Sequence, residues 1–413
     1  MMKKPRPNFT AIAMSLFAFF YVACAQEKPP VPVRSWDLNV NADYATRMAK
    51  QLRIITLRSP TIIFLDNKKI AVTYEGGRGA SPSNGTILVP GTFARKKAES
   101  LLYKFHALIF EVNTGPGIAK HLEWDAIREQ AQLMPTHDGG FAVRVDNQFM
   151  VYSSDSQLQK KMTLNYHGDK PLATGEEVFE ESYTGGISNS GHSLIVCHVL
   201  RGRHSGGGTQ VSWYDTTTLT PIGGASEIAR AAGCALYFKV ADDNTVYSGS
   251  YRVDPKNLVW KKINPRCIAC PPDASENPWQ RFEVLAPGHF LVFGKNDEIV
   301  DEDGHQDYLF THAPDMRVDG IHPAADTSRV VYSDGQSKDE PGHRQSLRIH
   351  VVDWREKRKI AVLKVIQDAS PVVHDGGLQL QQLGVMDVTY ALSPDGKELA
   401  VLDMNSLKVY DLP

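Results

Sequence analysis

The chain has 413 residues, 42% of them apolar and 22% charged, and its formal net charge at pH 7 is −2. This is an ordinary globular composition, and the chain is long enough to bury a large core. The mildly acidic balance argues against a nucleic-acid backbone or an anionic membrane as the partner.

The N-terminal segment has the pattern of a secretory signal peptide. Lys3, Lys4 and Arg6 precede an apolar run over residues 11–22, and Ala23-Cys-Ala25 is a small-x-small cleavage site. We therefore expect residues 1–25 to be removed and the protein to be periplasmic or secreted. Removal of the three cations takes the formal net charge to −5.

The alternative is that this segment is processed as a lipoprotein signal, with lipidation at Cys24. Val22-Ala-Cys24 satisfies part of a lipobox, and a lipidated cysteine would anchor the protein to a membrane. Tyr21 stands where a small aliphatic residue is usual, and Ala25 suits ordinary cleavage, so we favour the soluble exported form.

Residues 26–32 read as a stiff Pro-rich spacer, and residues 33–413 as one β-propeller domain. We expect residues 33–40 to form a strand that completes the last sheet of a ring. Residues 41–51 suggest a short helix, and the spacing of Leu122, Ala126, Ile127 and Leu133 suggests another over residues 122–133.

Seven units of short strands separated by turn residues follow one another along the chain. The last is the clearest, because Pro394, Asp395 and Gly396 form a turn between the strand ending near Leu392 and the strand starting at Leu399. The six earlier units have their strands and turns at residues 61–112, 136–152, 188–219, 235–260, 282–310 and 321–353.

Repeats of this size, each too small to bury a face alone, are typical of a β-propeller. We therefore predict an all-β fold, a seven-bladed β-propeller with short helical insertions. Two β-sandwiches would need a central linker, which is not visible. Ser393-Pro-Asp-Gly396 before an apolar strand, and Val-Tyr-Asp-Leu at residues 409–412, resemble WD-repeat-like and YVTN-type bacterial propellers. No unit has Gly-His or Trp-Asp at the WD-repeat positions, which departs from the strict WD-repeat pattern.

The mature chain keeps four cysteines, Cys197, Cys234, Cys267 and Cys270, as disulfide candidates in an oxidising compartment. Cys267-Ile-Ala-Cys270 is followed by Pro271, which excludes covalent haem attachment, and prolines crowd the motif. We favour a structural disulfide over a redox pair or a metal site, and the connectivity stays open.

Asp301, Asp303 and Asp307 are the candidate metal ligands. Oxygen ligands at alternating positions around Gly304 suit calcium, although the bidentate Glu of a complete twelve-residue loop is missing. A solvated hairpin turn is the alternative that we favour for the same residues.

Other motifs argue against catalysis. The glycines in residues 201–208 lack the Lys-Ser or Lys-Thr of a phosphate-binding loop. Residues 186–191 have the spacing GxSxxG and open a hairpin, so they do not form a nucleophile elbow. The sequence His-Asp-Gly-Gly occurs twice, at His137 and at His374. Divergence of the repeats explains this without a catalytic role.

We therefore expect no catalytic residues and no cofactor other than calcium. The favoured function is a non-catalytic protein- or ligand-binding scaffold in the cell envelope, engaging a protein or glycan as a monomer, with no transmembrane segment in the mature chain and no nucleic-acid partner. The alternative is a metal-assisted hydrolase or lactonase-type propeller enzyme, with His and Asp side chains converging near a central channel.

Overall fold

The computed structural model describes sixteen segments of the chain, and all structural statements below refer to them. They are residues 30–38, 60–76, 102–127, 131–145, 148–163, 178–202, 207–222, 238–248, 251–254, 259–263, 282–292, 297–310, 317–335, 345–367, 388–403 and 406–413.

The described strands form seven antiparallel sheets, numbered here in chain order. Sheet 1 contains β2 (Thr61–Phe64), β3 (Lys69–Gly76), β4 (Leu102–Glu111) and β5 (Lys120–Ile127). Sheet 2 contains β6 (Ala131–Pro135), β7 (Phe141–Val145), β8 (Gln148–Tyr152) and β9 (Leu158–Thr163). Sheet 3 contains β10 (Val178–Ile187), β11 (Ser193–Gly202) and β12 (Gly207–Asp215).

The other four sheets each have four strands. Sheet 4 contains β13 (Phe238–Val240), β14 (Val246–Ser248), β15 (Tyr251–Asp254) and β16 (Val259–Lys262). Sheet 5 contains β17 (Phe282–Ala286), β18 (His289–Val292), β19 (Glu298–Asp301) and β20 (Gln306–Leu309). Sheet 6 contains β21 (Arg317–Pro323), β22 (Arg329–Gly335), β23 (Gln345–Asp353) and β24 (Arg358–Gln367). Sheet 7 contains β25 (Val388–Leu392), β26 (Glu398–Asp403), β27 (Ser406–Asp411) and β1 (Arg34–Asp37).

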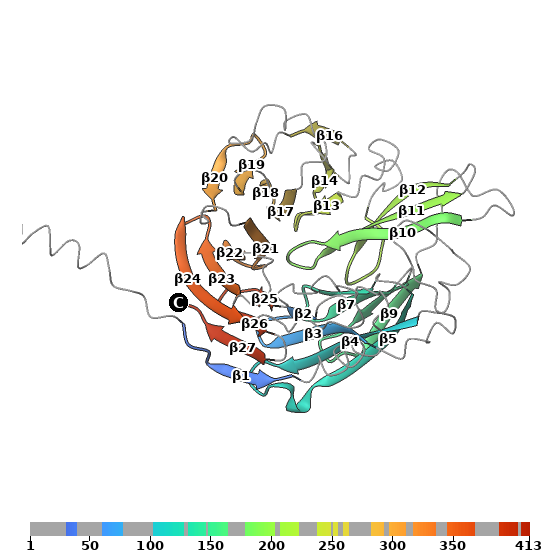
Figure 1. Ribbon diagram of the computed structural model, residues 1–413. Helices are drawn as coiled ribbons and strands as arrows, with labels where there is room; N and C mark the ends of the chain where they lie inside the picture. The colour runs from blue at the N-terminus through green and yellow to red at the C-terminus, as the bar shows by residue number, and fades with distance from the viewer. Residues whose placement is uncertain are drawn as a thin grey trace, which may run out of the picture.

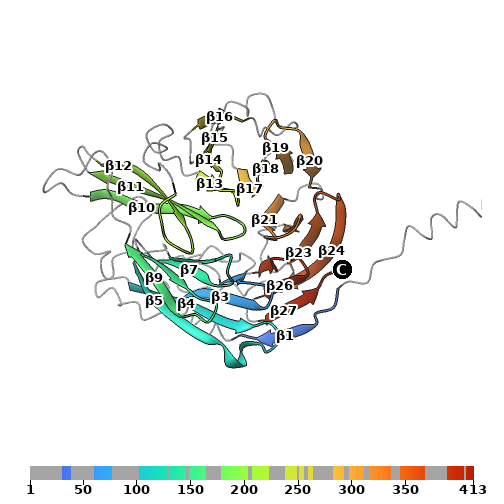
Figure 2. The same cartoon turned by 180° about the vertical axis from the view of Figure 1, so that it is seen from behind.

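The sheets are arranged around a common axis as a β-propeller, which confirms the predicted all-β fold class (Figures 1 and 2). The strands nearest the axis are β2, β6, β10, β13, β17, β21 and β25. Several of these inner strands touch their neighbours in the ring, including β2 with β25 and β6, and β13 with β10 and β17. The seven sheets match the seven sequence units one to one.

The core lies between neighbouring sheets, because alternate residues of a strand point to opposite faces. In β26, Leu399 and Val401 pack against sheet 6, whereas Ala400 and Leu402 pack against sheet 1. Both faces of the middle strands are therefore buried. This explains why their sequences read as continuous apolar runs without a polar face.

The turn that follows the inner strand of most sheets is built by short polar side chains, with a glycine in sheets 2, 3, 5 and 7. In sheet 7, the Ser393 hydroxyl donates to Asp395, the N–H of Lys397 donates to Asp395, and Gly396 has φ +68°. In sheet 2, the Thr136 hydroxyl and the N–H of Gly140 donate in the same way to Asp138. The predicted turns at these two positions are confirmed.

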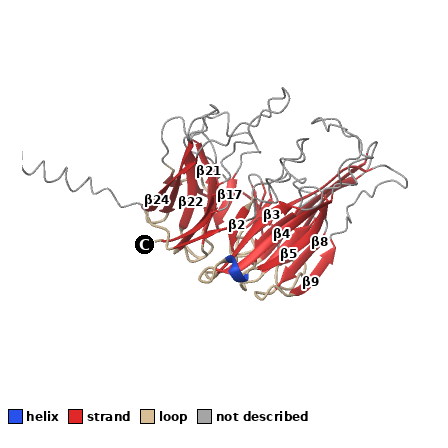
Figure 3. Ribbon diagram, turned by 60° about the horizontal axis from the view of Figure 1, so that its bottom comes forward, coloured by secondary structure: helices blue, strands red, loops and turns tan. Residues whose placement is uncertain are grey.

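These first turns lie at one end of the ring, which we call the turn face (residues 65–68, 136–140, 188–192, 241–245, 287–288, 324–328 and 393–397). The N–H of Asp326 donates to the Pro394 carbonyl at 2.9 Å, and that of Asp395 donates to Asn67 Oδ1 at 3.0 Å. Ser190 donates to Asp242 through both its N–H and its hydroxyl. Figure 3 shows the described turns gathered along one edge of the strands.

Long basic side chains also join one sheet to the turns of the next. Each donates a hydrogen bond to backbone carbonyls of its neighbour: Lys69 to Ser154, Lys120 to Asp155 and Ser156, Lys160 to Thr218, and Arg329 to Gly396. A backbone carbonyl in a turn has no partner in the sheet ladder, and these side chains supply the hydrogen bond that it would otherwise lack.

The N-terminal strand closes the ring, as predicted for residues 33–40. β1 pairs antiparallel with β27, with Trp36 opposite Leu407. Arg34 donates to Glu398 at 2.5 Å, to Asp411 at 3.1 Å and, in sheet 1, to Asn113 at 2.5 Å. The Trp36 ring lies against Phe110 of sheet 1, so β1 holds sheets 7 and 1 together.

The helix predicted over residues 122–133 is wrong. Residues 120–127 form β5, and residues 131–135 form β6. Leu122, Trp124 and Ala126 all face the core between sheets 1 and 2, and their spacing of two residues is that of a strand. The helix present in the described residues is a single 3₁₀ turn, η2 (Pro116–Ile118), and the helix predicted at residues 41–51 lies outside them.

We predict that Gly396→Val destabilises the protein by about 1–3 kcal/mol, because a left-handed backbone strains a β-branched residue. An added Cβ would also lie 2.8 Å from Arg329 Cδ in sheet 6. The melting temperature measures the effect. Gly117→Ala is the matched control, since an added Cβ there meets nothing within 4 Å. Equal melting temperatures for both variants would contradict the turn assignment.

We also predict that Trp36→Ala lowers stability by about 1–3 kcal/mol, less than the loss for a fully buried Trp because Trp36 is half-buried. Urea denaturation monitored by circular dichroism gives the value. Val31→Ala, at a residue that is 76% exposed beside the same strand, should leave the curve unchanged. A Trp36→Ala curve that overlays the wild type would show that β1 does not hold the ring closed.

Candidate functional site

A cavity of about 1080 Å³ lies among the inner strands, and it is the candidate binding site. Its walls come mainly from β2, β6, β21 and β25, from the end of β10, and from the turns that follow these strands, with further lining residues in β3, β4 and β7. A site shared by several rigid sheets is a common place for a ligand in a propeller-like scaffold.

Side chains of the same kind line the cavity at equivalent positions in sheets 1, 2 and 7. Leu65, Thr136 and Ser393 are equivalent, because the N–H of each bonds back across its own turn. Four residues earlier stand Thr61, Gln132 and Thr389, which are uncharged and polar.

Between these two levels the wall is mainly apolar, although the exposed His322 also lines it. It is formed by half-buried side chains one or two residues before the turns: Ile63, Pro135, Ile187, Pro323 and Ala391. The cavity therefore has a polar inner level, an apolar middle and a polar mouth at the turn face.

The mouth carries carboxylates and an imidazole. Asp66, His137 and Asp326 line it together with Asn67. His137 stacks on His192 of sheet 3 with ring centroids 4.0 Å apart. Next to it, burial tends to raise the pKa of Asp138, but hydrogen bonds from Thr136 and Gly140 hold that pKa below its usual value.

Asn189 lines the cavity and contacts sheet 5. Its side-chain amide donates to the carbonyls of Val284 and Leu285 at 3.2 and 2.7 Å. This joins a turn of sheet 3 to the inner strand of sheet 5, past sheet 4. The described lining residues accordingly come from sheets 1, 2, 3, 6 and 7.

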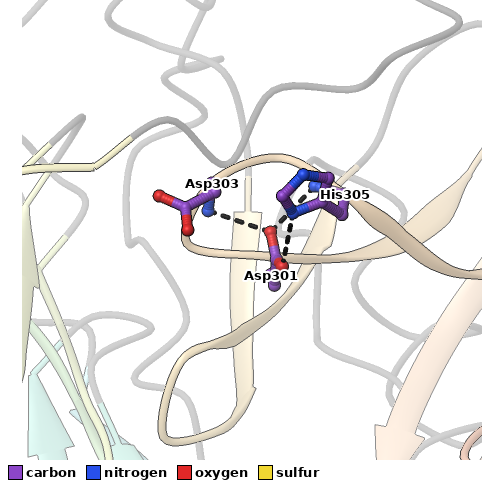
Figure 4. A group of neighbouring side chains, drawn as sticks. All are labelled: Asp301, Asp303 and His305. Atoms are coloured by element: carbon purple, nitrogen blue, oxygen red, sulfur yellow. Dashed lines mark hydrogen bonds and ion pairs between the residues drawn. The ribbon is translucent and has the colours of Figure 1, made fainter.

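The candidate metal ligands separate in the structure (Figure 4). Asp301 and Asp303 lie with His305, and one ligand atom of each falls within 4.8 Å of the others. Asp307 instead pairs with His289, with Oδ2 2.8 Å from Nδ1.

Asp301 is already satisfied within its own turn. Its Oδ1 accepts the N–H groups of Asp303 and His305, and its Oδ2 lies 2.9 Å from His305 Nδ1. Asp301 raises the pKa of His305. A cation here would compete with His305, and calcium binding at Asp301, Asp303 and Asp307 stays a prediction.

The other sequence motifs lie in turns or strands, or they fall outside the described residues. Ser188, the serine of the GxSxxG motif, is buried, and its Oγ accepts the N–H groups of His192 and Ser193 within the turn. Cys197 lies in β11, opposite Thr184 and Val211. Cys234, Cys267, Cys270 and His374 lie outside the described residues.

Residues 77–101, 203–206 and 336–344 connect second to third strands, so the strand ends that carry them lie opposite the turn face. The acidic turn after Asp301 joins a third strand to a fourth, as the turn at residues 153–157 does in sheet 2.

The sequence reasoning missed a buried charged network in sheet 6. Asp334, 1% exposed, accepts hydrogen bonds from Arg348 at 2.6 and 2.9 Å, and its Oδ1 lies 2.8 Å from His350 Nε2. The Tyr332 ring stacks on His350. The available signal was strand alternation, because residues 332 and 334 face residues 348 and 350 across β22 and β23.

We predict that His350→Asn reduces the loss of stability between pH 7 and pH 5. Burial lowers the pKa of His350, and Lys359 and Arg348 act in the same direction against Asp334. The unfolded chain therefore takes up this proton first as the pH falls below the ordinary value of about 6.5, which destabilises the native state. Urea denaturation at the two pH values measures the change.

His305→Asn provides a control of opposite sign. The pKa of His305 is raised in the folded chain, so its contribution to stability is present at low pH and lost as the pH rises. Its removal should enlarge the loss of stability between pH 7 and pH 5. The same change in both variants would contradict the burial argument for His350.

No protein-family model and no curated protein matches the chain. Solved structures with a similar fold include a chain of the mitotic checkpoint complex, 13% identical with a TM-score of 0.40, covering 100% of this chain and 98% of that one. A prolyl endopeptidase is 12% identical with a TM-score of 0.42, covering 98% of this chain and 61% of that one. A chain of the fission yeast SREBP-SCAP binding domains is 10% identical with a TM-score of 0.34, covering 97% of each chain. In the described residues, no helix is long and apolar enough to cross a membrane.

Proposed function

We propose that this protein is an exported, seven-bladed β-propeller of the WD-repeat-like and YVTN type that binds a protein or ligand without catalysing a reaction. In this proposal each of the seven sheets is one blade. The signal segment over residues 1–25 directs the chain to the cell envelope, and it works there as a monomer.

The observation that carries the proposal is the cavity among the inner strands. It is large, its walls come from five sheets, and each wall strand is fixed by pairing with the second strand of its sheet. Such a wall can hold a ligand with little loss of conformational entropy on binding.

The arrangement favours binding over the alternative of a metal-assisted hydrolase. That chemistry needs metal ligands that converge where the substrate lies. Asp66, His137 and Asp326 line the mouth, but in the described residues the group whose ligand atoms lie within 4.8 Å of one another is Asp301, Asp303 and His305, and none of these lines the cavity.

The proposal predicts that an envelope extract contains a component that binds the mature chain and leaves chemically unchanged. Binding to the native state raises the melting temperature by mass action. We would fractionate the extract by size, measure the melting temperature of the chain from Gln26 onward with each fraction, and identify the bound component by mass spectrometry before and after incubation.

Ala325→Trp tests whether the cavity is the site. Ala325 lines the mouth and is half-buried, so a large ring there should block entry and abolish the thermal shift. Ala325→Ser is the matched control and should keep it. Turnover of the bound component would establish an enzyme, and no shift with any fraction would contradict the binding function.

A further inference from the structure

We propose that the cavity binds a short neutral oligosaccharide. This inference rests on the binding function proposed above and names the ligand class for the same cavity. It is carried by the order of side chains along the wall: uncharged polar groups at the inner level, apolar groups in the middle and carboxylates at the mouth.

The inner level offers uncharged hydrogen-bonding groups from three sheets, with the largely buried Arg144 opposite Gln132 and the hydroxyl of Thr61 bonded to that of Thr73. Thr61, Gln132 and Thr389 occupy equivalent positions in sheets 1, 2 and 7, which are neighbours in the ring. Hydroxyl and amide side chains both donate and accept, as sugar hydroxyls do. A ligand with several hydroxyls can therefore bond to more than one sheet at once.

Thr389 has a hydroxyl that is ready for a ligand. Its Oγ1 is shielded from solvent and makes no hydrogen bond within the protein. A buried polar atom without a partner costs free energy. Thr389 belongs to the cavity wall and is half-buried, so a rotation about χ1 that turns Oγ1 towards the cavity would let it bond to a ligand hydroxyl there.

The middle level suits the non-polar faces of sugar rings. Ile63, Pro323 and Ala391 are half-buried in the free protein and leave apolar surface in the cavity. A pyranose ring has C–H faces and a hydroxyl rim, so it can cover these side chains while its rim reaches the inner level. Burial of apolar surface then adds to the hydrogen bonds.

The charges of the wall favour a neutral ligand over an acidic one. Asp66 and Asp326 line the mouth and would repel a carboxylate or phosphate. Arg144 also lines the cavity, but it is only 9% exposed and so lies largely within the wall. A charged ligand would lose hydration without an exposed counter-charge beside it.

The size is sufficient for more than one sugar unit. At about 1080 Å³ the cavity lies at the upper end of the range of about 300–1,000 Å³ for small-molecule sites. Trisaccharides are therefore suitable probes.

The test is isothermal titration of the mature chain with four neutral trisaccharides and one acidic one. The neutral probes are maltotriose, cellotriose, mannotriose and triacetylchitotriose, and the acidic probe is trigalacturonic acid. We expect at least one neutral probe to bind saturably at one site and the acidic probe not to bind. Thr389→Val should weaken that binding by about threefold to tenfold, the effect of one lost hydrogen bond, with an unchanged melting temperature.

Thr163→Val is the matched control, because Thr163 is an exposed threonine at the end of the outer strand β9. It should leave the affinity unchanged. The proposal is overturned if none of the neutral probes binds, if the acidic probe binds more tightly, or if Thr389→Val and Ala325→Trp both leave the affinity unchanged. If no probe binds but an envelope fraction still raises the melting temperature, the saccharide is wrong and the binding function stands. If neither occurs, both fail.

Discussion

The structure depends on the fact that no described hydrogen-bonded ladder runs from one sheet to the next. Each sheet has its own ladder, and its neighbours hold it mainly through side chains, with a backbone hydrogen bond between turns such as that from Asp326 to Pro394. The one pairing that joins the two ends of the chain is that of β1 with β27. Apolar packing between sheets supplies the free energy, while Lys and Arg side chains that reach the next turn fix how neighbouring sheets meet.

This mode of assembly explains the composition of the strands and the turns. A middle strand between two neighbours needs apolar residues on both faces, as β26 shows with Leu399, Ala400, Val401 and Leu402. The polar groups that remain are concentrated where the chain reverses direction. There they serve two purposes, closing each turn and contacting the turns beside it, as Asp395 does with Ser393 and Asn67.

Local chemistry was readable from the sequence, and contacts across the ring were not. Pro394, Asp395 and Gly396 specify a turn by themselves. Similar turns between short apolar runs made the repeated units predictable, and the pattern of residues 33–40 made the closing strand predictable. The spacing of Leu122 and Ala126 fits a helix as well as a strand, and only packing against sheet 2 decides between them. Asp307 looked like a ligand beside Asp301 because the two are close in sequence, yet its partner His289 comes from another strand.

The candidate site was harder still to foresee. The level formed by Thr61, Gln132 and Thr389 exists only because three turns align when the sheets assemble. The contact of Asn189 with β17 depends on a ring that brings sheet 3 near sheet 5. Neither relation leaves a pattern in any single stretch of sequence, because each depends on the closed ring rather than on neighbouring residues.

The position of β1 also sets the order in which the protein can mature. Arg34 and Glu398, which meet in the closing contact, are 364 residues apart along the chain. During synthesis the first strand of the ring emerges long before its partner, so it stays unpaired until the last strands exist. Such a distant contact is slow to form, and until it forms the edge of β27 lacks its partner. An unpaired strand edge can pair with another copy of the chain, so closure by β1 removes a site of aggregation.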